Sequence, residues 1–227
     1  MELRRNSDVI VETIAPQGKR IIDVGCGDGS LTRHLTKHGA RVLGVECGPR
    51  QLAKARAAEP AGDEEIVEGV GQALPAGDGE ADVVVFSNSL HHIPAEFMAK
   101  ALAEAVRVLK PGGTVYISEP IAEGAFFETA RPVDDETEVR ALALAAIGDC
   151  AAAGLTQIDE FFYLHPIEMT KFEDFHDRIV SANAEREEKF RAMEEDLRAL
   201  FAGNAKRTED GGYRFEQPMR INLLRKV

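Results

Sequence analysis

Three glycines at alternate positions, Gly25, Gly27 and Gly29, follow a short apolar run over residues 20–24. Glycine adopts the left-handed backbone of tight turns, and it lets a ligand lie against bare main chain. In the residues that follow, the apolar side chains are spaced as on one face of a helix. The free N–H groups at the start of a helix would face such a ligand. This stretch therefore predicts a strand, a glycine turn and a helix, which form the first unit of a nucleotide-binding α/β sheet.

Two acidic residues indicate which ligand this turn suits. Asp23 precedes the first glycine by two residues. Dinucleotide-binding turns have an apolar residue there, and they have a third glycine where this sequence has Ser30. A carboxylate repels pyrophosphate but attracts ammonium and sulfonium groups. We expect Asp23 to act on the ligand side, through water or by orienting the turn, or else to cap the helix. Glu46 ends the next predicted strand, where a carboxylate can accept from both hydroxyls of a ribose.

Polar residues also follow the most apolar segment of the chain, at residues 80–86. Ser87, Asn88 and Ser89 come directly after it, so they should reach the same edge of the sheet. His91 and His92 are the best candidates for a base or an acceptor-orienting group, because histidine titrates near neutral pH. Packing or capping of the following helix is the alternative role for each histidine.

Several of these segments, in this order, resemble the class I S-adenosylmethionine-dependent methyltransferases. Asp23 with the three glycines resembles the family's motif I. Residues 87–94 resemble its segment after the fourth strand, and the Leu-Lys-Pro-Gly-Gly of residues 109–113 resembles its segment before the fifth. The resemblance is to small-molecule enzymes of the ubiquinone/menaquinone-methyltransferase or "methyltransferase domain 11" type. It implies S-adenosylmethionine as cofactor and in-line methyl transfer to a small-molecule or lipid-like acceptor.

The adenine-binding segment of that family also has a counterpart here. The family has Gly-Asp-Ala-Glu-x-Leu-Pro after its third strand, whereas residues 69–75 read Gly-Val-Gly-Gln-Ala-Leu-Pro. Val70 replaces the aspartate that accepts from the adenine amino group, which leaves the backbone N–H of Gly71 and the side chain of Gln72 for this contact. The predicted cofactor-binding residues are Asp23, Gly25, Cys26, Gly27, Glu46, Cys47, Gly71, Gln72, Ser87, Asn88 and Ser89.

The order of elements predicts an α/β fold. We expect a Rossmann-like, doubly wound, seven-stranded sheet between two helical layers, and the resemblance implies a mostly parallel sheet whose last strand is antiparallel between strands five and six. One domain should cover residues 1–227, with a helical insertion at about 166–210. Residues 170–201 predict one long or broken amphipathic helix. Its Phe/Met stripe should pack as core or lid, and the alternatives are a dimer face or an apolar roof over the acceptor.

Two further local patterns give structural expectations. The glycines at residues 110–113 predict a turn that closes a helix over residues 95–109. Residues 134–153 predict one alanine-rich helix.

Composition limits the function classes. The formal charge of −12 argues against a nucleic-acid backbone as the main partner. The chain also lacks the Asn/Asp-Pro-Pro-Tyr/Phe segment common in enzymes that methylate base amines. Its three cysteines have no metal-ligand spacing, so no metal site is predicted, and an odd count without a secretory signal fits the cytoplasm. The apolar runs are too short to span a membrane.

Two other function classes stay open from the sequence. The first is a nicotinamide-dependent oxidoreductase, against which Asp23 and Ser30 count. The second is a non-catalytic S-adenosylmethionine-binding protein, suggested by Val70 and the large C-terminal helical segment.

Overall fold

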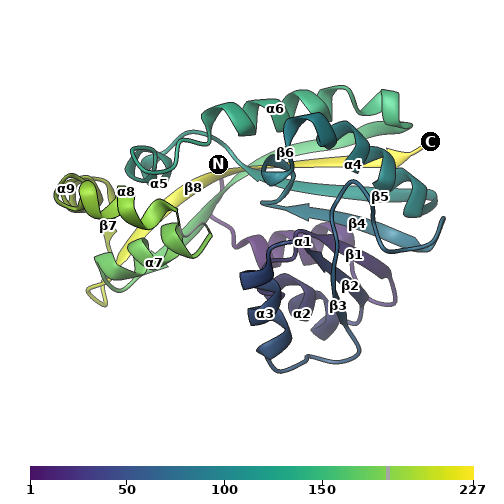
Figure 1. The fold of residues 1–227 in the computed structure, drawn as a ribbon, viewed down its shortest axis with the longest axis horizontal. Coiled ribbons are helices and arrows are strands. Elements are labelled where there is room, and N and C mark those ends of the chain that lie inside the picture. The colour runs from purple at the N-terminus through teal and green to yellow at the C-terminus, as the bar shows by residue number, and fades with distance from the viewer. Residues whose placement is uncertain (183–184) are drawn as a thin grey trace. The chain divides into compact units, whose positions relative to one another are not determined.

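The computed structural model describes residues 1–182 and 185–227 (Figure 1). The chain divides into two compact units. The larger unit holds residues 6–119, 141–161 and 220–227, and the smaller unit holds residues 1–5, 120–140 and 162–219. Every predicted site residue lies in the larger unit. The organisation of the chain as one domain stays a prediction.

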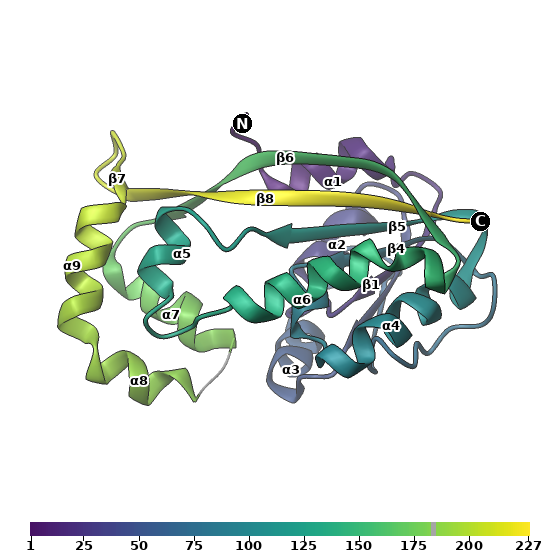
Figure 2. The ribbon, with the colours of Figure 1, turned by 90° about the horizontal axis from the view of Figure 1, so that it is seen from above.

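The described strands form one mixed sheet in the order β3-β2-β1-β4-β5-β8-β6, with β7 paired to β8. The sheet is mostly parallel and its C-terminal strands are antiparallel. Figure 2 shows β8 between β5 and β6. The strands are β1 (Arg20–Val24), β2 (Arg41–Glu46), β3 (Glu65–Glu68), β4 (Ala81–Ser87), β5 (Leu109–Pro120), β6 (Leu155–Met169), β7 (Lys206–Arg207) and β8 (Tyr213–Lys226). The predicted fold class and the place of the last strand are confirmed.

Strand β1 lies between β2 and β4, and the three parallel strands end at the same edge. Val24 pairs with Val45 of β2 and with Phe86 of β4. The glycine turn after β1, Glu46 at the end of β2 and Ser87 at the end of β4 therefore leave the sheet side by side. This carboxyl edge is where ligands bind in open α/β sheets.

Helices cover both faces of the sheet in the larger unit. Figure 1 shows α1, α2 and α3 on one face and α4 on the other. The described helices are α1 (Asn6–Ile14), α2 (Ser30–Lys37), α3 (Pro49–Ala57), α4 (Ala95–Val108), α5 (Ala125–Ala130), α6 (Thr137–Gly148), α7 (Phe172–Ala182), α8 (Arg186–Ala192) and α9 (Glu194–Asn204), with short 3₁₀ turns η1 (Leu90–His92) and η2 (Cys150–Ala153). No helix in these ranges combines the length and apolarity needed to cross a membrane.

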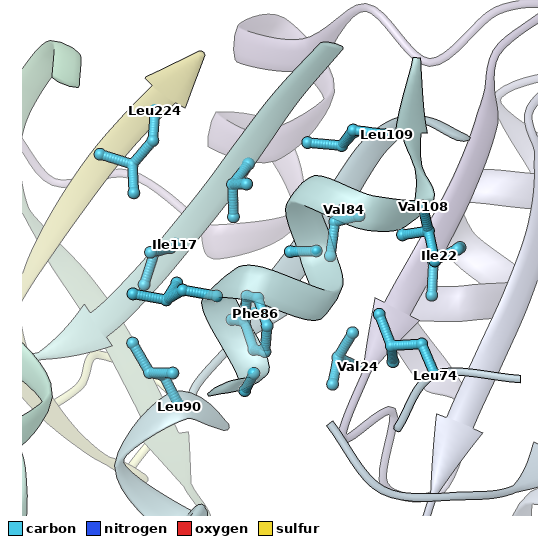
Figure 3. Close-up of a cluster of buried hydrophobic side chains, with 14 of the residues drawn as sticks. Ile22, Val24, Leu74, Val84, Phe86, Leu90, Val108, Leu109, Ile117 and Leu224 are labelled. Atoms are coloured by element: carbon cyan, nitrogen blue, oxygen red, sulfur yellow. The ribbon is translucent and has the colours of Figure 1, made fainter. Parts of the chain in front are cut away.

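The core between the sheet and α4 explains why the site edge is firmly held. Alternate residues of the central strands, such as Ile22, Val24 and Phe86, point to this face and are buried (Figure 3). Leu102 and Val108 of α4 pack against them. Burying side chains of this size stabilises the fold by about 1.5–3 kcal/mol each. The strand ends that carry the polar residues are therefore anchored by a close-packed core.

The smaller unit has its own apolar core. The aromatic stripe predicted at residues 170–201 forms it: Phe172, Phe175, Phe190 and Phe201 are buried together. The Phe172 and Phe201 rings lie edge to face with centroids 5.5 Å apart, a favourable aromatic geometry. The stripe thus packs as core, which was the first of its predicted roles.

Two local expectations were wrong in detail. The glycine segment at residues 110–113 lies inside β5 at an irregularity, because the pairing of Ala81 with Leu109 is followed by that of Val83 with Thr114. The helix predicted over residues 134–153 is shorter and ends in η2. The segment predicted at 170–201 as one long or broken helix is the broken form, made of α7, α8 and α9, and residues 183–184 of that prediction lie outside the described residues.

Candidate functional site

The glycine turn has the left-handed backbone that its sequence requires. Gly25, Gly27 and Gly29 have φ angles of 71°, 58° and 76°. A Cβ at Gly25 would lie 2.7 Å from the Cβ of Ser89, whereas a Cβ at Gly27 would meet no atom within 4 Å. The backbone at Gly27 therefore borders open space, as the predicted role beside a ligand needs.

Glu46 holds the turn in place from the neighbouring strand. The carboxylate Oε2 accepts from the N–H of Gly27 at 2.8 Å, and Oε1 accepts from the N–H of Gly48 at 2.6 Å. A carboxylate has about four acceptor positions. Two of them remain after these bonds, which equals the number of hydroxyls on the ribose of an adenosyl group.

Asp23 lies buried behind the turn. Its side chain is 1% exposed, and Oδ2 accepts from the Thr32 hydroxyl in α2 at 2.8 Å. Burial raises the pKa of Asp23 to about 6, the nearby charge of Glu46 adds to this rise, and the Thr32 hydrogen bond opposes it. Gly44 makes this contact possible, because a Cβ there would lie 2.9 Å from the Thr32 hydroxyl oxygen.

The serines after β4 close the other side of the turn. Ser89 is buried and its hydroxyl donates to the carbonyl of Val24 at 2.6 Å, so it packs directly over Gly25. Asn88 is exposed and has a left-handed φ of 52°. Ser87 is half-buried at the end of β4. The structure thus brings the residues after β1 and β4 together.

The two candidate bases have different surroundings. His91 is buried in η1, and its Nδ1 contacts the carboxylate of Glu119 at the end of β5. The other carboxylate oxygen of Glu119 accepts from the N–H of Leu90 at 3.0 Å. His92 is exposed, although its ring lies 4.0 Å from that of His91 between centroids. A carboxylate that holds one imidazole nitrogen fixes the tautomer and orientation of the ring.

The remaining predicted residues surround the turn less directly. Cys26 is buried, and burial raises the pKa of its thiol to about 12, so it is no nucleophile at neutral pH. Cys47 is an exposed residue beside Glu46. Partial burial of its thiol, and then the charge of Glu46, raise the pKa of that thiol. Gly71 is buried, and a Cβ added there would lie 2.7 Å from the side chain of Ile93. Gln72 is half-buried beside it.

Two contacts at this site did not follow from the sequence analysis. The Thr32 bond to Asp23 depends on the turn folding α2 back over β1. The pairing of Glu119 with His91 joins residues 28 positions apart. One indication of the second contact was present in the sequence: His91 follows β4 and Glu119 lies at the end of β5, and these two strands are parallel neighbours.

Comparison with known proteins identifies the segment that carries this site. Residues 22–117 match the methyltransferase domain family Methyltransf_11. This match covers less than half of the chain, and it shows that residues 22–117 are similar to methyltransferase domains. The match to this family implies S-adenosylmethionine as cofactor of the methyltransferase domain.

Individual relatives agree over the same part of the chain. A ubiquinone biosynthesis O-methyltransferase of Nitrosococcus oceani is 38% identical over 104 residues, which cover 44% of this chain and 43% of that protein. Other curated relatives include an uncharacterized methyltransferase of Synechocystis, 35% identical over 42% of this chain and 44% of that protein. The chain therefore spans less than half the length of these curated relatives.

Solved structures show the same fold over nearly the whole chain. The BH2331 protein of Bacillus halodurans aligns with a TM-score of 0.64 at 19% identity, covering 97% of this chain and 98% of that one. These values show the fold of the chain, and the functional roles of individual residues stay predictions.

Proposed function

We propose that this chain transfers the methyl group of S-adenosylmethionine to a small-molecule acceptor. The observation that carries the proposal is the pair of acids, Asp23 and Glu46, around a glycine turn. Among the described residues, no Lys or Arg forms an ion pair with either carboxylate. A buried carboxylate without a cationic partner is costly to the fold. A ligand that carries positive charge would supply that partner.

This pair of acids also favours one cofactor over another. S-adenosylmethionine carries an ammonium and a sulfonium, whereas a nicotinamide dinucleotide carries a pyrophosphate. Negative charge at the turn attracts the first and repels the second. The two acceptor positions left on Glu46 suit the ribose hydroxyls, and the main chain at Gly27 suits close approach of the adenosyl group.

The remaining residues have roles in positioning and proton transfer. When bound, S-adenosylmethionine supplies a methyl group that its positive sulfur already activates. The chain then has to align the acceptor for in-line attack and exclude water, and alignment alone can lower the barrier by about 7–11 kcal/mol. Where the acceptor atom carries a proton, we propose that the imidazole of His91 accepts it. Glu119 contacts Nδ1 of His91 and so holds the ring in position.

A transfer assay tests this proposal. The wild-type chain is incubated with methyl-tritiated S-adenosylmethionine and fractionated metabolite extracts, with the His91→Asn variant in parallel. We expect label in a small-molecule fraction with the wild type and about a hundredfold less with the variant, the usual scale of a lost base. Binding of the cofactor without transfer to any fraction would instead favour the non-catalytic alternative.

A further inference from the structure

A cavity of about 310 Å³ lies beside the carboxyl ends of β4 and β5, entirely within the larger unit. Ser87 and Ser118, which are direct partners in the β4–β5 register, line it from the sheet. Ile10 of α1 and Leu31 of α2 line it from the helices. Leu31 comes two residues after Gly29 of the glycine turn, so the cavity adjoins the predicted cofactor site. Its volume is at the lower end of the range for small-molecule sites.

The wall of this cavity contains a buried polar atom without a partner. Ser118 is 1% exposed, and its hydroxyl makes no hydrogen bond to any described residue. Its main chain is fixed, because its carbonyl accepts from the N–H of Asn88 at 2.8 Å. Buried hydroxyls almost always have a partner, and leaving one unsatisfied destabilises a fold. A polar group of a ligand in the cavity would satisfy Ser118.

The lining also indicates the charge of that ligand. None of the lining residues in the described chain is Lys, Arg, Asp or Glu. His34 is the one titratable imidazole among them, and burial and the neighbouring His38 lower its pKa, which keeps it neutral at pH 7. A charged ligand group would therefore lose its hydration without gaining an opposite charge. The other polar lining groups are hydroxyls and an amide, which suit uncharged donors and acceptors.

We propose that this cavity binds the non-reacting part of the acceptor, a small uncharged molecule with a hydroxyl or carbonyl group that hydrogen-bonds to the Ser118 hydroxyl. His91 does not line the cavity, so the reacting atom of the acceptor lies outside it. The apolar part of the acceptor lies against Ile10 and Leu31. This assignment rests on the proposed methyl transfer, because the acceptor must lie next to the glycine turn. It makes Ser118 a residue that determines specificity.

Two nearly isosteric probes test the assignment by ligand-observed NMR titration, with and without saturating S-adenosylhomocysteine. They are 4-hydroxyacetophenone, which is uncharged, and 4-hydroxybenzoate, which carries a carboxylate. We expect the uncharged probe to bind the wild type at least tenfold more tightly than the charged one. Ser118→Ala should weaken its binding about fivefold or more, the scale of one hydrogen bond. Leu31→Trp should abolish it by filling the cavity.

A control variant and a second ligand complete the experiment. Thr13→Ala removes a hydroxyl from the same helix as Ile10 but outside the cavity, so it should bind the probe as the wild type does. All three variants should retain wild-type affinity for S-adenosylhomocysteine, which also shows that they are folded. The assignment is overturned if the wild type does not prefer the uncharged probe, if Ser118→Ala binds it unchanged, or if the cavity variants lose S-adenosylhomocysteine. Failure of the wild type to bind S-adenosylhomocysteine would instead overturn the proposed function.

Discussion

The carboxylate of Glu46 and the backbone N–H of Gly27 are joined by a hydrogen bond of 2.8 Å between adjacent strand ends. One acid thus fixes the turn that borders the predicted ligand and keeps acceptor positions for the ligand itself. Glu46→Ala should weaken S-adenosylmethionine binding by about 1–3 kcal/mol, because it removes polar contacts that nothing replaces. Titration calorimetry measures this change.

The control for that variant is Glu68→Ala. Glu68 pairs with Glu46 in the β2–β3 register but is exposed and ends a different strand. Its removal deletes one negative charge at the same edge and leaves the turn intact, so cofactor affinity should change little. Equal losses in the two variants would mean that Glu46 contributes only charge.

Asp23 gives the stability of the chain a specific pH dependence. Its pKa rises from 3.8 in the unfolded chain to about 6 in the fold, so between pH 4 and 6 the folded state binds more protons. Stability must therefore fall as the pH rises through this window, by roughly 3 kcal/mol for a shift of about two units. Asp23→Asn removes this loss. In urea unfolding, the stability of Asp23→Asn relative to the wild type should increase from pH 4.5 to pH 7. A difference that does not change with pH would contradict the raised pKa of Asp23.

His91 and Glu119 should behave as a base and its positioning residue. Glu119→Gln keeps an oxygen for the Leu90 N–H but replaces the oxygen that contacts His91. We expect kcat to fall about 10- to 100-fold with little change in KM, since the ring loses its orientation but the acceptor contacts remain. His92→Asn is the matched comparison, because His92 is exposed. If His92→Asn loses as much kcat as His91→Asn, the assignment of the base to His91 is wrong.

The two glycines of the turn should differ in their tolerance of a side chain. Gly25→Ala and Gly27→Ala both place alanine in a left-handed conformation, which costs about 1–2 kcal/mol. Gly25→Ala also forces a clash with Ser89, so its free energy of unfolding should be lower than that of Gly27→Ala by about 1–3 kcal/mol. Chemical denaturation measures both, and Ser89→Gly in the Gly25→Ala background should recover part of the loss.

The parts of the fold that follow from short stretches of sequence were predictable. The strand at Arg20–Val24, the glycine turn and Glu46 at the end of β2 each have a local pattern. The irregular start of β5 was missed because Pro111 and the glycines after it signal a turn, while pairing with β4 continues on both sides of them. Tertiary pairing overrides the local signal there.

The site was predictable only as far as strand ends reveal it. In open α/β sheets, ligands bind at the carboxyl ends of the strands. This rule alone predicted that the glycine turn, Glu46 and residues 87–89 lie close together. Which polar group meets which depends on contacts between distant segments, such as those of Thr32 with Asp23 and of Glu119 with His91. The unsatisfied hydroxyl of Ser118 becomes visible only when every neighbouring donor and acceptor is placed.

The measurement that tests the central claim most directly is calorimetric titration of the wild-type chain with S-adenosylmethionine and with NAD, at pH 7 and at pH 5. We predict binding of S-adenosylmethionine at pH 7, up to about tenfold weaker binding at pH 5 as Asp23 becomes protonated, and no binding of NAD. Binding of NAD without binding of S-adenosylmethionine would contradict the account.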